Sequence, residues 1–186
     1  WVHAGSFGQA ATKSAPLRVK KTNDGVIVHR WMLDVEPAPF YKKVVGFDGN
    51  CDRLQHYEVR YPSNALIKAV FTPAGTGGSE GKLHDDVFIM DSYNFMTPVT
   101  ESKTRYYWFQ LRNIRPDDSA LSQLMTDDVQ QAFEEDRNVL NEVQKGMTNK
   151  TSPHIDLPID AGQLRFRRQL QAMINEEEQV DKQMAQ

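Results

Sequence analysis

The sequence predicts an α+β fold in which helices lie on one face of a curved antiparallel sheet. Strand-like segments fill the first part of the 186 residues, short turns connect them, and two long helical segments follow. Strands first and helices last are typical of one α+β domain. A chain of this length can bury the core that such a domain needs.

The first two strands form a predicted β-hairpin. Residues 17–21 and 26–33 flank Asn23-Asp24-Gly25, a sequence that readily adopts the positive φ angles of a tight hairpin turn. A loop rich in Pro and Gly follows, and we expect a short helical turn over residues 40–44 within it.

Four more segments are rich in β-branched and aromatic residues, namely 54–61, 65–72, 86–96 and 104–112. Together with the hairpin they predict about six antiparallel strands joined by local turns. The glycine-rich stretch 75–82 lacks the G-x-x-x-x-G-K-[ST] spacing of a phosphate loop and lies between strands, so we interpret it as a mobile hairpin loop.

Two helices are predicted in the last part of the chain. From residue 119 to about residue 146 apolar residues recur every three or four positions, and Pro and Gly are absent until Gly146. Pro153 and Pro158 then interrupt the chain. The final helix is expected over residues 161–184, with 176–178, three glutamates, on a solvated face.

Composition excludes several classes of function. The net charge of −3 argues against a nucleic-acid partner, and no apolar run reaches the roughly 20 residues of a membrane helix. The single Cys51 excludes an internal disulfide and a Cys-rich zinc or iron–sulfur site, and favours a cytoplasmic location. The chain begins with neither Met nor a signal peptide, so we expect it to be the interior of a longer protein.

Asp136 is an unusual residue of the first predicted helix. It falls on the apolar stripe formed by Val129, Phe133, Leu140 and Val143, and its helical neighbours are apolar. A carboxylate on a buried face costs several kcal/mol unless it is paired or bound to a metal.

Three interpretations of Asp136 remain open from this pattern. It pairs with an arginine of the sheet, the helix is locally mis-phased and leaves it half exposed, or it binds a metal ion. The arginine candidates are Arg53, Arg60 and Arg105. Glu134 and Glu135 point elsewhere in this pattern and are expected to be ordinary solvated charges.

The remaining histidines favour structural roles. His84-Asp85-Asp86 could form a second metal site, but its place beside the glycine-rich loop favours a solvated strand start. His29 and His56 lie within strands, where a packed or hydrogen-bonded histidine is the usual finding.

Four separated segments of the chain carry a recognisable set of motifs. They are the start, Trp1-Val2-His3-Ala4-Gly5-Ser6-Phe7-Gly8-Gln9, then the strand pair from Phe95-Met96-Thr97-Pro98 to Arg112-Asn113, then Phe133-Glu134-Glu135-Asp136-Arg137, and finally Leu164-Arg165-Phe166-Arg167-Arg168. In this order they resemble Rieske-type oxygenases of the vanillate O-demethylase kind, and the start is similar to the end of that family's H-E-T-x-V-H-x-x-S-x-G-Q motif.

The resemblance implies that His3 and Asp136 bind a mononuclear Fe(II). His3 matches the second histidine of the motif, the first would precede Trp1, and Asp136 matches the carboxylate ligand. Two imidazoles and one carboxylate on one face of Fe(II) leave positions for O2 and substrate. The implied fold is a helix-grip (START/Bet v 1-like) sheet that curves around an aromatic substrate.

Two residues are expected to contact the substrate. Asn94 stands where many relatives have a histidine that faces the substrate. Trp108 belongs to an aromatic segment that alternates across a strand, and we predict that it forms a wall of the pocket.

The resemblance also implies components outside residues 1–186, which correspond to the catalytic domain alone. The family's [2Fe-2S] cluster binds in a preceding Rieske domain, and NAD(P)H supplies electrons through a ferredoxin/flavin-type reductase. The intact protein is expected to be a homotrimer of a bacterial cytoplasm. Without the first histidine and the cluster, the isolated chain is expected to hold iron poorly and to be inactive.

The first hypothesis is therefore that the chain belongs to the oxygenase component of a monooxygenase that acts on an aromatic substrate. O-demethylation is the favoured reaction, and ring hydroxylation, including dioxygenation, remains open. The alternative is a non-enzymatic helix-grip module that binds a hydrophobic ligand. The alternative predicts that Asp136 meets an Arg or Lys and that His3 lies far away.

Overall fold

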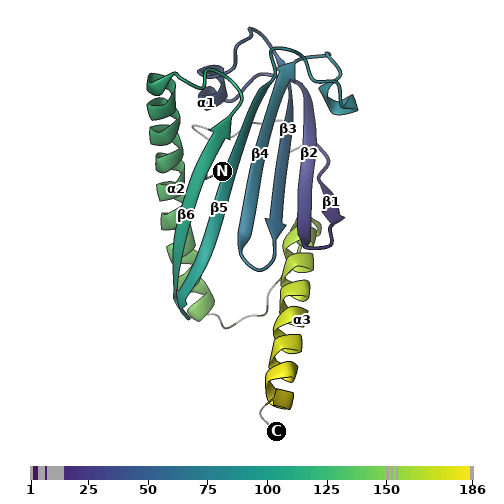
Figure 1. Cartoon of the computed structure of the whole chain (residues 1–186), viewed down its shortest axis with the longest axis vertical. Helices are drawn as coiled ribbons and strands as arrows, with labels where there is room; N and C mark the ends of the chain where they lie inside the picture. Colours follow the sequence, from purple (N-terminus) through teal and green to yellow (C-terminus); the bar gives the residue numbers. More distant parts are fainter. Residues whose placement is uncertain are drawn as a thin grey trace.

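The fold is built on one six-stranded antiparallel sheet. The computed structural model describes residues 2, 3, 7, 15–149, 151, 153 and 155–184. Each strand pairs with the next one in the chain, so the sheet is a meander (Figure 1). The strands are β1 (Arg18–Lys21), β2 (Gly25–Val35), β3 (Cys51–Arg60), β4 (Asn64–Pro73), β5 (Phe88–Thr100) and β6 (Lys103–Arg112). The predicted sheet is confirmed.

The predicted turn at Asn23-Asp24-Gly25 connects β1 and β2. The N–H of Thr22 donates to the carbonyl of Gly25 at 3.0 Å and closes the hairpin. Gly25 also lies against β3, where an added Cβ would be 2.0 Å from the carbonyl oxygen of Val59. This position therefore requires glycine for space, while the positive φ angles that were predicted for the turn are not found at residues 23–25.

Several strands extend beyond their predicted ends, and β5 shows why. We predicted that this strand ends at residue 96, two residues before Pro98, which cannot donate a ladder hydrogen bond. In the structure Pro98 pairs with Thr104 of β6, while the pairing of β5 with β4 runs only as far as Phe95. Pro98 thus lies in a part of β5 that has a neighbour on one side, where proline is tolerated.

The hydrophobic core lies between the sheet and the helices α1 (Pro39–Lys42) and α2 (Ser119–Thr148). The predicted helical turn near residue 40 is confirmed as α1, which begins with Pro39 in the position where its fixed φ suits a helix start. Figure 1 shows α2 running along one face of the sheet beside β5 and β6. The buried core residues include Phe40, Val44, Cys51, Phe71, Phe88, Met90, Leu121, Met125 and Val129.

The apolar stripe of α2 is buried only in part. Val129 and Ala132 are buried, and Phe133 packs against the core, as predicted. Leu140 and Val143 are 63% and 49% exposed, so the predicted continuation of the stripe is wrong for the described chain. These residues follow Ala132, the last buried residue of the helix, and lie beyond the region where α2 meets the core.

The last helix, α3 (Ala161–Met184), packs against β1 and β2, at the edge of the sheet opposite to β6 (Figure 1). Its start follows a short 3₁₀ turn, η3 (Pro158–Asp160). Phe166 stacks on Tyr61 with ring centroids 5.2 Å apart, and Gly162 lies against Val28. The rest of α3 extends away from the sheet (Figure 1), and the three glutamates at 176–178 are exposed as predicted.

No helix within the described ranges has an apolar stretch long enough to cross a bilayer.

Candidate metal centre

The structure brings together the two residues that the resemblance predicts as metal ligands. Nε2 of His3 lies 3.1 Å from Oδ1 of Asp136, although the two residues come from opposite ends of the chain. Asp136 is on α2, one helical turn beyond the buried Ala132. The prediction that Asp136 has a partner is therefore met, and that partner is a histidine rather than Arg53, Arg60 or Arg105.

His3 is held against the core through its contact with Phe7. The backbone N–H of Phe7 donates to the carbonyl of His3 at 3.1 Å, which forms a turn. The ring of Phe7 packs on Phe40 with centroids 4.5 Å apart, and Arg53 donates to the Phe7 carbonyl at 3.4 Å. Phe7 thus ties the backbone of His3 to the core, while the imidazole of His3 reaches α2.

The Asp136 side chain is half-buried, whereas its apolar helical neighbours predicted a buried position. Its side chain is 42% exposed because Leu140, on the next turn, lies outside the core. Partial burial still raises the pKa of Asp136 above its ordinary value of 3.8, and His3 opposes that rise by attraction and hydrogen bonding. Of the three interpretations, the half-exposed helix face describes the position of Asp136, and its contact is with the histidine that the resemblance predicts as a metal ligand.

Glu135 is a correction to the sequence analysis, which treated it as a solvated charge. Its Oε2 lies 2.9 Å from Nδ1 of His3, so both nitrogens of one imidazole face carboxylates of α2. The apolar-stripe pattern could not reveal this contact, because it depends on where the N-terminal segment crosses the helix. Glu134 does point elsewhere and pairs with Arg137.

The donor atoms and their spacing suit iron. Two atoms that each lie about 2.1 Å from one metal ion, at a right angle, are about 3.0 Å apart, close to the 3.1 Å between His3 and Asp136. One imidazole and one carboxylate are two members of the 2-His-1-carboxylate set. Among the described residues no group of three or more His, Cys, Asp or Glu side chains could hold a metal ion.

Asn94 and Trp108 lie directly opposite each other on β5 and β6, on the face of the sheet that meets α2. Trp108 packs edge-on against Phe133 of α2, with centroids 5.1 Å apart. Asn94 is only 1% exposed, and its amide donates to the carbonyl of Ser92 at 3.0 Å.

Tyr106 is a further residue of this region that the sequence analysis did not single out. Its hydroxyl donates to Oδ1 of Asn94 at 2.7 Å, and its ring contacts Phe133. Burial, and then the negative charge of Asp136, raise the pKa of Tyr106 to about 12. Tyr106 therefore remains a neutral hydroxyl beside the carboxylate. Its position two residues before Trp108 on the same face of a strand is the signal that could have identified it.

His84, His56 and His29 have contacts that suit the structural roles predicted for them. His84 lies 3.5 Å from a nearby acid, Asp86, and both are exposed. His56 lies 3.3 Å from Glu58 on the face of the sheet away from α2, and its ring is 6.5 Å from that of His29. Burial lowers the pKa of His29, which favours its neutral form.

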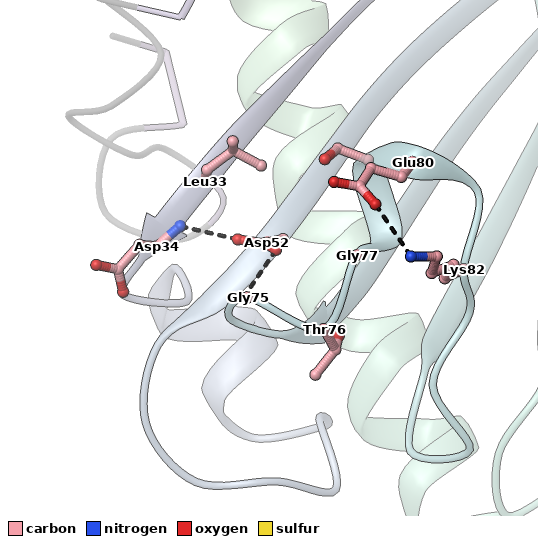
Figure 2. A pocket seen from close by; sticks show the side chains of 9 residues that line it. Leu33, Asp34, Asp52, Gly75, Thr76, Gly77, Glu80 and Lys82 are labelled. Atoms are coloured by element: carbon pink, nitrogen blue, oxygen red, sulfur yellow. Dashed lines mark hydrogen bonds and ion pairs between the residues drawn. The ribbon is translucent and has the colours of Figure 1, made fainter.

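A polar hollow of about 340 Å³ lies at the glycine-rich loop that connects β4 and β5. Figure 2 shows Asp34, Asp52, Glu80 and Lys82 around it, with Leu33 as its one apolar side chain. Asp52 accepts the N–H groups of Asp34 and Gly75, and Lys82 pairs with Glu80. Aromatic ligands are usually bound in predominantly apolar pockets, so this hollow does not suit one. The loop contains the short 3₁₀ helix η2 (Gly78–Glu80) between two strands, not a strand followed by a helix as in a phosphate loop.

Two curated relatives match most of the chain. A toluene-4-sulfonate monooxygenase system iron-sulfur subunit of Comamonas testosteroni is 29% identical over 166 residues, which are 87% of this chain and 48% of that protein. A vanillate O-demethylase oxygenase subunit of Pseudomonas sp. is 28% identical over 190 residues, which are 99% of this chain and 57% of that protein. The chain thus spans about half the length of the curated relatives it matches.

The fold is that of a solved oxygenase. Dicamba monooxygenase bound to 3,6-dichlorosalicylic acid superposes with a TM-score of 0.81 at 19% identity, over 95% of this chain and 52% of that one. This similarity confirms the predicted helix-grip arrangement of a curved antiparallel sheet and C-terminal helices. A family model described as the vanillate O-demethylase oxygenase C-terminal domain matches residues 1–176. The chain belongs to the vanillate O-demethylase oxygenase C-terminal domain family.

Proposed function

We propose that this chain is the catalytic domain of a Rieske-type oxygenase component that oxidises an aromatic substrate with O2 at a mononuclear Fe(II). The observation that supports this most directly is the approach of His3 Nε2 to Asp136 Oδ1, in a chain that belongs to this family. The alternative of a metal-free binding module predicted an Arg or Lys beside Asp136 and a distant His3. Neither expectation agrees with this contact.

His3 and Asp136 would hold the iron together with a histidine that precedes the chain. When bound, such an iron supplies the site at which O2 is reduced and one of its oxygen atoms is delivered to the substrate. His3 contributes a neutral nitrogen donor, and Asp136 contributes a negative charge that the metal ion would neutralise.

The residues of the sheet and α2 would bind and orient the substrate next to this site. Trp108 and Phe133 present aromatic surface on which a ring can pack. Asn94 is buried and hydrogen-bonded within the protein, so we assign it the task of holding the Tyr106 hydroxyl. Tyr106, which is 44% exposed, is then placed to contact a polar group of the substrate, and its high pKa keeps its proton in place.

The favoured reaction is O-demethylation of a methoxylated aromatic acid. One oxygen atom of O2 enters a C–H bond of the methyl group, and the other leaves as water after uptake of two electrons and two protons. The resulting hemiacetal breaks down to a phenol and formaldehyde. Relatives with the names vanillate O-demethylase and chloroacetanilide N-alkylformylase support an oxidation of this type.

The electrons would come from outside the residues described here. We propose a preceding domain with a [2Fe-2S] cluster, a ferredoxin/flavin reductase that uses NAD(P)H, and a homotrimeric assembly. The name of the Comamonas relative, an iron-sulfur subunit of a monooxygenase system, is consistent with this arrangement, as is the length that the chain spans of it.

The test is substrate-dependent O2 uptake by the chain joined to the sequence that precedes it in its gene, loaded with Fe(II) and supplied with a reductase. We expect Asp136→Ala to lower the rate at least about a hundredfold, because loss of an outer contact of a ligand already costs tenfold to a hundredfold. Asp127→Ala, an exposed acid on the same helix, should retain the rate. Normal turnover by Asp136→Ala would refute the ligand assignment.

A further inference from the structure

The two carboxylates of α2 that meet His3 contact different nitrogens of its ring. Glu135 Oε2 lies 2.9 Å from Nδ1, and Asp136 Oδ1 lies 3.1 Å from Nε2. Successive side chains of a helix project about 100° apart, so they do not normally contact the same group. Here the imidazole of His3 lies between the two side chains, so that each carboxylate contacts one of its nitrogens.

This arrangement offers a carboxylate to each nitrogen of His3, so the position of its hydrogen decides which nitrogen can bind a metal ion. A neutral imidazole has one N–H and one lone pair, and an ionised carboxylate can only accept a hydrogen bond. If Nδ1 donates its hydrogen to Glu135, the lone pair is on Nε2, the atom that faces Asp136. In that form, His3 can share a metal ion with Asp136.

Glu135 also restricts the ring in space. The backbone of His3 is held on the core side by the turn with Phe7, whose ring lies 6.2 Å from the imidazole. The contact with Glu135 holds the other side of the ring, from α2. A histidine whose backbone and ring are both held in place loses less conformational freedom when a metal ion binds to it.

We propose that Glu135 is a positioning residue that accepts the Nδ1–H of His3 and keeps Nε2 directed at the metal ion held with Asp136. This inference rests on the proposed function, since it assumes that His3 and Asp136 bind the iron. It gives Glu135 and Asp136, adjacent residues of one helix, different tasks: Asp136 contacts the metal ion and Glu135 acts only through the histidine.

The first test measures Fe(II) affinity by anaerobic titration of the protein that includes the preceding sequence. We expect Glu135→Leu, which removes the acceptor, to weaken binding by about tenfold to a hundredfold. Glu135→Gln keeps an oxygen acceptor without the charge and should recover part of the loss. The matched control is Glu134→Leu, which makes the same change one position away. Glu134 contacts Arg137 and Gln130 instead of His3. The Fe(II) affinity of this variant should stay within about twofold of that of the unmodified protein, as expected for a surface substitution.

The second test identifies the nitrogen that binds, by ¹⁵N NMR of the histidines with Zn(II) as a diamagnetic substitute. We expect His3 to bind through Nε2 with a proton on Nδ1, and this preference to weaken in Glu135→Leu. Binding through Nδ1 would overturn the proposal.

The outcomes also separate this inference from the proposed function. If Asp136→Ala loses the metal ion while Glu135→Leu binds as tightly as the unmodified protein, only the role of Glu135 is refuted. If neither substitution changes the affinity, His3 and Asp136 are not the metal site and both proposals fail. If Glu135→Leu abolishes binding and Asp136→Ala does not, Glu135 is itself the ligand and its assignment as a positioning residue is wrong.

Discussion

Single carboxylates in this protein differ in role because their hydrogen-bond partners differ. Asp52 is 4% exposed, and its two oxygens accept the backbone N–H groups of Asp34 and Gly75 at 2.9 and 3.0 Å. It thus joins the irregular end of β2 to the loop after β4. Asp34 has a φ of 51°, a conformation that is uncommon outside glycine and that this hydrogen bond helps to hold.

Asp52→Ala should destabilise the fold. The substitution leaves two partly buried N–H groups without their acceptor, and we expect the free energy of unfolding to fall by about 2 kcal/mol. Urea denaturation monitored by fluorescence measures this change. Asp48→Ala, at an exposed loop position, should stay within about 0.5 kcal/mol. Equal stabilities of the two variants would contradict the role given to Asp52.

At the same scale, the sequence could predict Asp136 but not Glu135. An acid among apolar helical neighbours stands out in a periodic pattern, and the resemblance supplies its partner. Glu135 follows no such pattern, since its importance comes from a histidine 132 positions earlier that crosses the helix at that point. The arginine candidates were wrong because Arg53 lies over the rings of Tyr41 and Phe71, while Arg60 pairs with Glu58.

At the scale of elements, the β1–β2 hairpin combines a turn with a close approach of strands. Gly25→Ala should therefore be costly, because its new Cβ would overlap the carbonyl oxygen of Val59, a backbone atom. We expect a loss of about 2 kcal/mol or more, which corresponds to a decrease of roughly 4–8 °C in Tm for a chain of this size.

Gly46→Ala is the matched control for this prediction. Nothing lies within 4 Å of the Cβ that it would add, and its φ is not in the left-handed region. We expect no loss of stability and a gain of up to about 1 kcal/mol, because the unfolded chain loses freedom. Thermal unfolding followed by circular dichroism compares the two variants, and a larger loss for Gly46→Ala would contradict the structure of the hairpin.

The strands and helices were predictable because the sequence alternates or repeats with the right period, while their ends were not. β5 continues through Pro98 because that residue is paired on one side only, which a single sequence does not reveal. The extent of burial along α2 was also missed. Apolar residues at Leu140 and Val143 continue the helical pattern, but the core that they would contact ends at Ala132.

At the scale of the whole molecule, the sheet and α2 enclose ionisable groups that are neutral in the folded state. Burial raises the pKa of Tyr41 to about 12 and that of Cys51 to about 11, from ordinary values of 10.0 and 9.0. Unfolding exposes both groups and lets them ionise at their ordinary values. Above about pH 9 the unfolded state therefore binds fewer protons than the folded state, and stability falls as the pH rises.

We expect the free energy of unfolding to decrease by about 3 kcal/mol between pH 8 and pH 11 from these two groups. Urea denaturation at each pH measures the decrease. The double variant Tyr41→Phe, Cys51→Ala should show a clearly shallower dependence, whatever its stability at pH 8. The same slope in both proteins would show that neither group is responsible.

The arrangement of the whole chain places an imidazole from its start against a carboxylate from its long helix, and a shared Fe(II) is the central claim. The most direct measurement is anomalous diffraction at the iron edge, on crystals of the Fe(II)-loaded protein that includes the preceding sequence. We predict one anomalous peak within about 2.2 Å of both His3 Nε2 and the Asp136 carboxylate. A peak elsewhere, or no iron with His3 and Asp136 in contact only with each other, would contradict the claim.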